Sequence, residues 1–209
     1  TGGLFINQHW SLRREALTIH YYQEALSMRY KPKDHTLKNG VLCHLRSPLP
    51  ADAAAILHLM KAPSDETDFM ARYSDEITMP TLREEKFLES TLSSPADLMI
   101  CAVVDGTIIA NAGLSPIAQR ERYRHRATFG ISIRKEYWGL GIGSLLLSAI
   151  ITCAGEMGLE MIELEVVCEN KRAIALYEKY GFRIYGTRPH SFKYRDGSYA
   201  DEHLMLLDL

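Results

Sequence analysis

Apolar and polar positions change their spacing several times along the chain, and each change predicts a new element. Residues 41–46 alternate as in a strand, and two prolines then interrupt the pattern. Asp52 follows and is placed to cap a helix with apolar side chains on one face, namely Ala53, Ile56, Leu57 and Met60. A capping box that begins at Thr81 predicts a second helix ending before Pro95, and a short helix is expected within residues 63–79. A strand followed by helices therefore opens the predicted fold.

The middle of the chain contains three successive runs rich in β-branched residues. Residues 98–104 and 107–114 are separated only by Asp105-Gly106, a dipeptide that suits the positive φ angles of a type I′ turn. A basic loop leads to the third run, residues 127–133. These runs predict an antiparallel meander.

Helices and strands alternate in the last third. Residues 144–157 predict an apolar helix that Gly158 ends, and residues 161–167 predict a strand. Asn170 is placed to cap a helix over residues 171–180, and the tail is expected to form two strands around a turn. The whole order predicts an α+β fold, with a mixed and mostly antiparallel sheet flanked by helices.

Residues 1–40 differ in character from residues 41–209. They are polar with clustered tyrosines, and only residues 11–28 show a loose helical pattern, so we treat residues 1–40 as an N-terminal extension of unknown role. The uncharged stretch from residue 137 to residue 155 approaches membrane-spanning length, but its glycines indicate a loop that enters a buried helix. No membrane partner is expected.

Composition restricts the possible functions. The chain has 209 residues, 24 Lys plus Arg against 26 Asp plus Glu, and a net charge of -2, so nucleic acid is not an expected partner. The 4 cysteines form no CxxC pair and the 8 histidines show no ligand spacing, so no metal site is expected. Without a recognisable secretion signal, the sequence predicts a cytoplasmic protein.

A glycine-rich loop is the segment that carries chemistry. Its sequence, GLGIGS over residues 139–144, follows the third meander strand and precedes a helix. Amides at such a loop bind phosphate, and glycines let a pyrophosphate approach closely. The spacing fits neither a Walker loop nor a Rossmann fingerprint, and a tight turn before a buried helix is the alternative interpretation.

This loop and residues 170–182 together resemble the GCN5-related N-acetyltransferase (GNAT) family. The loop is similar to a Q/R-x-x-G-x-G/A motif that binds the pyrophosphate of acetyl-coenzyme A, although Trp138 stands at the Gln/Arg position. Residues 170–182 are similar to N-x-x-A-x-x-L-Y-x-x-x-G-F. The resemblance covers residues 41–209 and extends to the ribosomal-protein and polyamine acetyltransferase branch. It implies the acyl-CoA N-acyltransferase fold and acetyl-coenzyme A as co-substrate.

The resemblance also implies which residues contact this co-substrate. The third meander strand would pair with pantetheine, the loop with pyrophosphate, Asn170 with the pantetheine arm and Lys179 with a phosphate. A plain helix cap and a solvated helix face are the respective alternatives for the last two. The implied set is Ile131, Ser132, Ile133, Gly139, Leu140, Gly141, Ile142, Gly143, Ser144, Asn170 and Lys179.

Two residues are implied to be catalytic. Tyr177 occupies the position of a tyrosine that protonates the departing thiolate, and Tyr180 is then a bystander. Glu165, twelve positions before Tyr177, matches a glutamate used as the base. Glu163 shares its strand face and is the fallback, and a water chain is a third route.

These features predict an N-acetyltransferase that moves acetyl from acetyl-coenzyme A to a primary amine by direct attack. The alternative is a non-catalytic acetyl-coenzyme A sensor or scaffold. The acceptor is expected to be a small-molecule amine, such as a polyamine, an amino acid or an aminoglycoside-like drug, or a protein N-terminus. The glutamates at 163, 165 and 169 favour a cationic amine in a negative cleft. The oligomeric state, a homodimer included, is left open.

Overall fold

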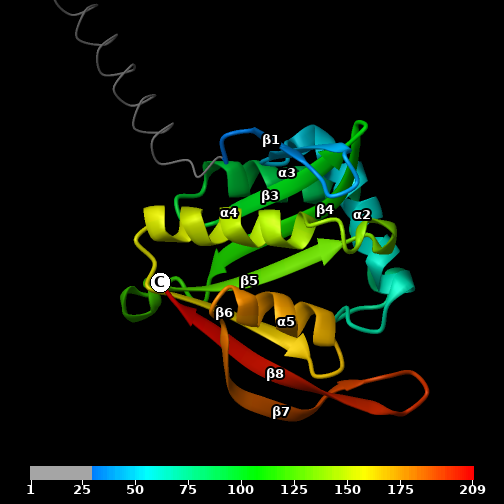
Figure 1. The fold of residues 1–209 in the computed structure, drawn as a ribbon, viewed down its shortest axis with the longest axis vertical. Coiled ribbons are helices and arrows are strands. Elements are labelled where there is room, and N and C mark those ends of the chain that lie inside the picture. The colour runs from blue at the N-terminus through cyan, green and yellow to red at the C-terminus, as the bar shows by residue number, and fades with distance from the viewer. Residues whose placement is uncertain (1–29) are drawn as a thin grey trace, which may run out of the picture.

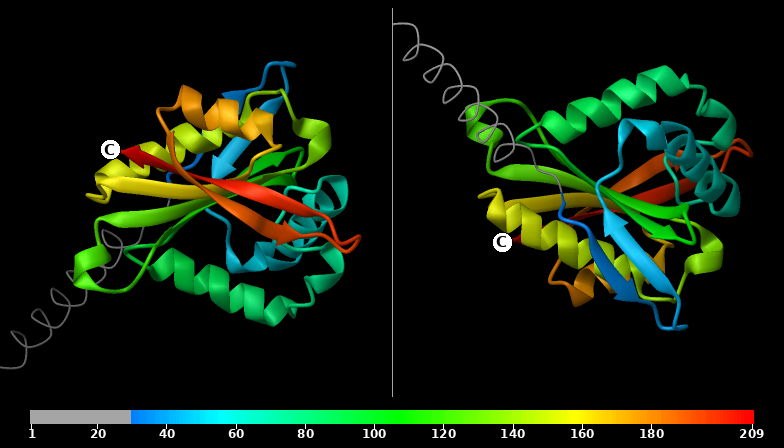
Figure 2. Two further views of the ribbon diagram at one scale, coloured as in Figure 1. Left: turned by 90° about the horizontal axis from the view of Figure 1, so that it is seen from below. Right: turned by 90° about the horizontal axis from the view of Figure 1, so that it is seen from above.

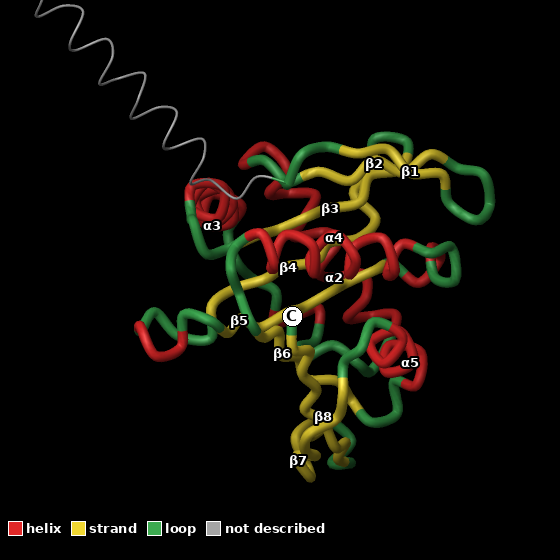
Figure 3. Tube along the Cα trace, turned by 60° about the vertical axis from the view of Figure 1, so that its left-hand side comes forward, coloured by secondary structure: helices red, strands yellow, loops and turns green. Residues whose placement is uncertain are grey.

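The computed structural model describes residues 30–209, so the helix predicted over residues 11–28 lies outside the described residues. An eight-stranded sheet with the order β1-β2-β3-β4-β5-β6-β8-β7 runs through this part of the chain (Figure 1 and Figure 3). The strands are β1 (Lys33–Thr36), β2 (Leu42–Arg46), β3 (Leu98–Val104), β4 (Thr107–Pro116), β5 (Arg126–Ile133), β6 (Met161–Val167), β7 (Arg183–Lys193) and β8 (Tyr199–Asp208). The helices are α2 (Ala53–Glu66), α3 (Thr81–Ser93), α4 (Ile142–Glu156) and α5 (Lys171–Lys179).

The four helices cover the two faces of the sheet. Figure 2 shows α4 and α5 on one face and α2 and α3 on the other. On β3, Ile100 packs into the core beneath α4, whereas its neighbour Cys101 packs with Ile56 of α2 and Leu88 of α3. Neighbouring residues of a strand point to opposite faces, which explains why β3 is apolar throughout.

The pairing of the strands confirms the predicted α+β fold. Of the neighbouring pairs in the sheet, β5 and β6 run parallel and the others antiparallel. The turn between β3 and β4 has φ angles of 47° at Asp105 and 74° at Gly106, as a type I′ turn requires. No helix within residues 30–209 is long and apolar enough to cross a membrane.

Some local predictions differ from the structure. The predicted extension contributes β1 to the sheet, where β1 pairs with β2 across a turn at residues 37–41, and Leu37 lies buried in the core. Lys38-Asn39-Gly40, which was expected to end the extension, instead joins two strands. Pro63 lies inside α2, and residues 74–76 form a single 3-10 turn where a separate helix was predicted. Thr81 is the first residue of α3 after Pro80, so the predicted capping box is not formed.

Candidate active site

β5 and β6 pair for only a short distance and then separate. Their parallel register runs from Arg126–Met161 to Thr128–Glu163, although β5 continues to Ile133 and β6 to Val167. Figure 1 shows the two strands diverging, with α5 beside the opening. Residues 129–133 therefore have β4 as a partner on one edge, while the other edge faces the opening. An exposed strand edge of this kind binds an extended ligand by main-chain hydrogen bonds.

The glycine loop enters this opening at the start of α4. Gly139 and Gly141 have φ angles of 82° and 97°, which favour glycine, and Gly141 is the N-cap of α4. The helix therefore begins at Ile142, two residues before the predicted start, and its first turn carries three of the loop residues, Ile142, Gly143 and Ser144. Amides of a first helical turn lack acceptors within the helix and are available to an anion.

Gly143 also has a packing role. A Cβ atom at this position would lie 2.9 Å from Cδ2 of Leu176 and 3.5 Å from Cδ1 of Ile133. The absence of a side chain lets α4 approach both α5 and β5. The Tyr180 hydroxyl strengthens the same contact by donating to the Ser144 carbonyl at 3.0 Å. Tyr180 thus connects the two helices, which fits its expected bystander role.

Trp138 stands where the loop motif has Gln or Arg, and two contacts hold its side chain beside the loop. Its indole nitrogen donates a hydrogen bond to the Ile133 carbonyl at 2.9 Å. The guanidinium carbon of Arg172 lies 4.8 Å from the centre of the Trp138 ring, a cation–π distance. Arg172 was not among the predicted site residues, although its place two residues after Asn170 was a usable signal.

A second missed cation comes from the β1–β2 turn. The Lys38 amide donates to the Leu140 carbonyl at 3.2 Å, and its Cε atom lies 3.9 Å from the position of a Cβ at Gly141. The turn thereby carries a lysine to the glycine loop. No local sequence signal indicated this contact, because about 100 residues separate the two segments.

The other residues that were predicted to contact the co-substrate differ in their surroundings. Asn170 is the N-cap of α5, where its Oδ1 accepts from the Ala173 amide at 3.2 Å. The predicted helix cap is therefore confirmed, and the compatible contact with pantetheine stays a prediction. Lys179 lies on α5 with its amine 5.9 Å from the ring centre of Tyr180. The Ser132 hydroxyl is buried and has no hydrogen-bond partner among residues 30–209. An unpaired buried hydroxyl on β5 fits a ligand that completes its hydrogen bonding.

Tyr177 lies in the apolar core between α5 and the sheet. It is 6% exposed, and its ring centre lies 6.1 Å from that of Phe129 on β5 and 5.9 Å from that of Phe182. Burial raises the pKa of the Tyr177 phenol above its usual range, so the group is protonated at neutral pH. Its hydroxyl makes no hydrogen bond to another described residue and is available as a donor.

Glu165 lies on the opposite face of the sheet, in a bidentate ion pair. The two Arg188 Nη atoms lie 2.9 and 2.7 Å from the Glu165 carboxylate, and Nη1 is also 3.2 Å from Oε2 of Glu202. The Arg188 hydrogen bonds hold the pKa of the Glu165 carboxyl below its ordinary value. Tyr177 and Glu165 thus belong to different faces of the sheet, on either side of the opening.

The fallback residue Glu163 is paired as well. It accepts from the Arg126 Nε atom at 2.6 Å, and the Tyr185 hydroxyl lies 3.5 Å from its other oxygen. Arg126 and Arg188 lie beside the carboxylates that were expected to supply a negative field and offset part of their charge, so the negative cleft stays a prediction. Both arginines are distant in sequence from β6, and the motifs do not include them.

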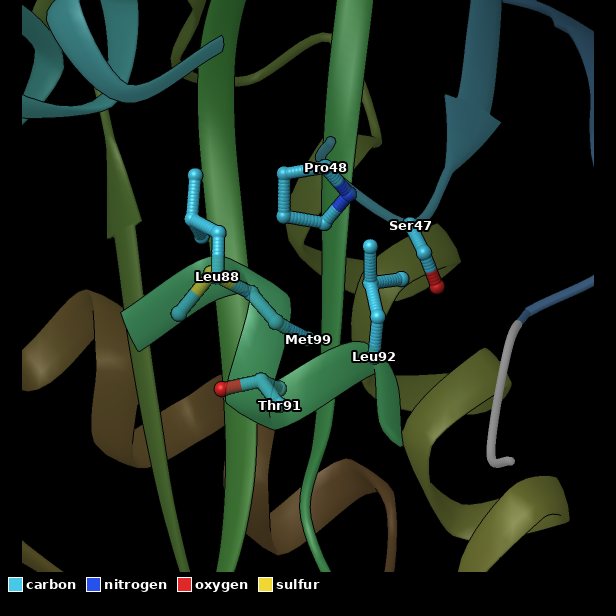
Figure 4. A pocket seen from close by; sticks show the side chains of 6 residues that line it. All are labelled: Ser47, Pro48, Leu88, Thr91, Leu92 and Met99. Carbon is cyan, nitrogen blue, oxygen red and sulfur yellow. The ribbon is translucent and has the colours of Figure 1, made fainter. Parts of the chain in front are cut away.

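A cavity of about 250 Å³ lies beside these groups. It is lined by Pro116, Ile117, Thr128, Glu163, Leu164, Glu165 and Tyr185. Its volume suits a small ligand, and its polar groups gather where β5 and β6 begin to separate. By contrast, the space that Figure 4 shows around Pro48, Leu88 and Met99 lies between α3 and the sheet, away from the opening. Residues 30–209 contain no group of three side chains suited to hold a metal ion.

Comparison with known proteins identifies this arrangement. The family described as the Acetyltransferase (GNAT) family matches residues 61–182, more than half of the chain. The chain belongs to the GNAT acetyltransferase family. It is 30% identical to the Escherichia coli L-amino acid N-acetyltransferase AaaT over 134 residues, which are 64% of this chain and 82% of that protein.

Solved GNAT structures agree with the fold. A GNAT acetyltransferase from Streptococcus pneumoniae superposes with a TM-score of 0.77 at 33% identity, over 80% of this chain and 99% of that chain. A Salmonella typhimurium structure that contains its cofactor acetyl-coenzyme A has a TM-score of 0.70 at 20% identity, over 80% and 94% of the chains. The expected GNAT-type acyltransferase and its acyl-CoA N-acyltransferase fold are thereby confirmed.

Proposed function

We propose that the protein transfers an acetyl group from acetyl-coenzyme A to the primary amine of a small molecule by direct attack. The observation that carries the proposal is the opening between β5 and β6, with a protonated tyrosine on one side and a polar cavity on the other. The glycine loop, the exposed edge of β5 and the unpaired Ser132 hydroxyl fit an extended ligand that ends in phosphates. Four free cysteines support a location in the reducing cytoplasm.

Each candidate residue has a separate task in this reaction. Bound acetyl-coenzyme A supplies an acetyl thioester. Loop amides and the first turn of α4 bind its pyrophosphate, with Lys38 and Arg172 close enough to add positive charge. Tyr177 donates a proton to the departing sulfur, and the apolar surroundings that raise the pKa of its phenol also disfavour a bare thiolate there. Glu165 accepts the proton of the acceptor's ammonium group, with Glu163 or a water chain as the alternatives.

An amino acid is the acceptor that we favour. The cavity has about 250 Å³, which suits an amino acid better than a folded protein's terminus or a long polyamine. The relative from Escherichia coli is named for L-amino acids. Arg126 and Arg188 beside the cavity also suit a ligand with a negative group.

Acetyl transfer to a panel of amines tests the proposal. The purified protein is mixed with acetyl-coenzyme A and amino acids, polyamines, an aminoglycoside or a short peptide, and thiol release and the acetyl mass shift are measured. We expect turnover on at least one small amine. Binding of acetyl-coenzyme A without turnover on any amine would favour the sensor or scaffold, and turnover on the peptide alone would assign a protein N-terminus.

A further inference from the structure

Arg188 on β7 forms ion pairs with two carboxylates, those of Glu165 and Glu202, which differ in their exposure to solvent. Glu202 is buried, with a side chain 8% exposed, and it also accepts a hydrogen bond from the Ser191 hydroxyl. Glu165 takes the bidentate position on the same guanidinium, yet its side chain is 51% exposed. A buried carboxylate needs its cation, whereas an exposed one is solvated by water after release. Glu165 is therefore the replaceable partner of Arg188.

The pairing also opposes a role of Glu165 as a base. Other charged or titratable groups near it are Tyr185 from β7, Glu202 from β8, Glu163 from β6 and Arg126 from β5, and Glu163 has Arg126 as its own partner. While Arg188 binds Glu165, the carboxylate's lone pairs point at the guanidinium, and its proton affinity is low. An event that separates this pair would free a base at the cavity wall.

We propose that Arg188 binds the carboxylate of the acceptor in place of Glu165 and thereby releases Glu165 to deprotonate the acceptor's amine. This inference rests on the proposed function, and it names the acceptor class as molecules that carry an amine and a carboxylate close together. The guanidinium presents a planar fork that matches any carboxylate, so an incoming carboxylate reproduces the geometry that Glu165 leaves.

The positions of the groups support this exchange. Glu165 lines the cavity, and Arg188, which is not part of the lining, holds the Glu165 carboxylate at 2.7 and 2.9 Å, so an acceptor carboxylate reaches Arg188 by taking the place of Glu165. An α-amino acid that bound Arg188 would hold its amine within a few ångströms of the same guanidinium, where the released Glu165 lies. Arg188 retains Glu202 at 3.2 Å throughout, which keeps the guanidinium in position during the exchange.

Glu165 and Tyr177 account for every proton that the reaction transfers. The acceptor enters as an ammonium ion, and Glu165 takes one proton and later releases it to water. The neutral nitrogen forms the C–N bond as the C–S bond breaks, and Tyr177 gives its proton to the sulfur. The second proton lost by the nitrogen restores the Tyr177 phenol. One proton is released to solvent per acetyl group transferred.

Each L-amino acid is compared with its own carboxamide, which keeps the amine and removes the carboxylate. In the parent, we expect kcat/KM for the best amino acid to exceed that for its amide by at least about tenfold, the worth of a charge-assisted hydrogen-bond pair. The acid limb of the kcat profile, which reports the enzyme–substrate complex, should lie at higher pH for the amino acid than for the amide, because only the amino acid frees Glu165. This measurement needs no variant.

The variant Arg188→Gln then tests whether Arg188 recognises the acceptor's carboxylate or only supports the structure. We expect kcat/KM for the amino acid to fall at least about tenfold, mainly through KM, while kcat/KM for the amide stays or rises because Glu165 is free. The acid limb for the amide should move to higher pH. Arg188→Lys, which keeps the charge without the fork, should give an intermediate ratio. Ser191→Ala is the matched control, because it removes another contact of Glu202 and should leave the ratio unchanged.

A different set of results overturns the inference. If the parent acetylates amino acids and their amides equally, or if Arg188→Gln lowers both equally, Arg188 has only a structural role. Should Arg188→Gln not fold because Glu202 is left unpaired, the double variant Arg188→Gln/Glu202→Gln removes that buried charge and receives the same two substrates. Failure of every amine in the panel contradicts the proposed function, whereas turnover without a preference for carboxylates contradicts this inference alone.

Discussion

The two faces of the opening between β5 and β6 are built by different means. On the face covered by α4 and α5, the site consists of positive-φ glycines, a helix start and one phenol held by Phe129 and Phe182. On the opposite face, β5, β6, β7 and β8 contribute arginines and carboxylates in ion pairs. The first face places its groups by backbone geometry and close packing, and the second by charge pairing across strands.

This difference has consequences for the two substrates. A packed core leaves little freedom, so the face that carries Tyr177 suits a ligand that is the same in every turnover. Exposed ion pairs contribute little to stability and exchange partners readily, so the other face suits recognition of a variable acceptor. Mutations on the first face should therefore affect rate and cofactor affinity, whereas those on the second should affect acceptor choice.

The largest effect is expected at the phenol. Tyr177→Phe should lower kcat by about 10² to 10⁴, the usual contribution of a positioned proton donor, with little change in stability because the buried ring is kept. Thiol release and calorimetry measure the two quantities. Tyr180→Phe is the matched control, since it loses a hydrogen bond to Ser144 and should reduce stability more than rate. If Tyr177→Phe and the parent turn over equally fast, Tyr177 is not the proton donor.

The glycine loop tests the same face through charge. Gly141 has a φ of 97°, which Asn and Asp tolerate better than other residues, so Gly141→Asn and Gly141→Asp have similar strain. The aspartate variant should bind acetyl-coenzyme A about fivefold to tenfold more weakly than the asparagine variant, because its carboxylate repels the pyrophosphate. Isothermal calorimetry at two salt concentrations measures this difference. Identical affinities would place the pyrophosphate elsewhere.

A third prediction compares two arginine–carboxylate pairs. Arg46 and Asp52 pair at 2.6 Å with side chains only 23% and 18% exposed, whereas Glu165 is largely exposed. Asp52→Asn should lower the free energy of unfolding by about 1 to 3 kcal/mol at neutral pH. Glu165→Gln should lower it much less. Chemical denaturation measures both, and a larger loss for Glu165→Gln would contradict the assignment of the acceptor face to recognition.

The pH dependence of the Asp52 effect has a definite sign. The Arg46 hydrogen bond lowers the pKa of the folded Asp52 carboxyl, so its stabilisation is present above the unfolded pKa of about 4. The stabilisation is lost as the pH falls through the lower, folded pKa. The difference in stability between the parent and Asp52→Asn should therefore disappear in strong acid.

The smallest effect is expected at Trp138. Trp138→Phe removes the indole hydrogen bond to the Ile133 carbonyl and keeps a ring beneath Arg172. We expect a loss of about 1 kcal/mol, or about 2 to 4 °C in Tm. Cofactor affinity should change less than in Gly141→Asp, because the loop amides remain. If Trp138→Phe loses more affinity for acetyl-coenzyme A than Gly141→Asp does, Trp138 contacts the cofactor directly.

Features that depend on neighbouring residues could be predicted from the sequence. The β3–β4 turn follows from Asp105-Gly106, the cap of α5 from Asn170, and the end of α4 from Gly158, whose φ is 72°. Each of these is decided by the conformational preference of one or two residues. The glycine loop and the position of Tyr177 on α5 could be predicted for the same reason, since motif spacing within one element is a local property.

The sequence by itself thus determined the order of elements, the loop and the phenol of this GNAT protein. Only the tertiary structure decided that β5 and β6 separate after Thr128, that Lys38 reaches the glycine loop, and that Arg188 binds Glu165. These contacts join segments far apart in the chain, and their formation depends on strand order and register. The charge on this side of the sheet is a sum over such contacts, and the arginines of β5 and β7 offset only part of the negative charge that the carboxylates of β6 predict.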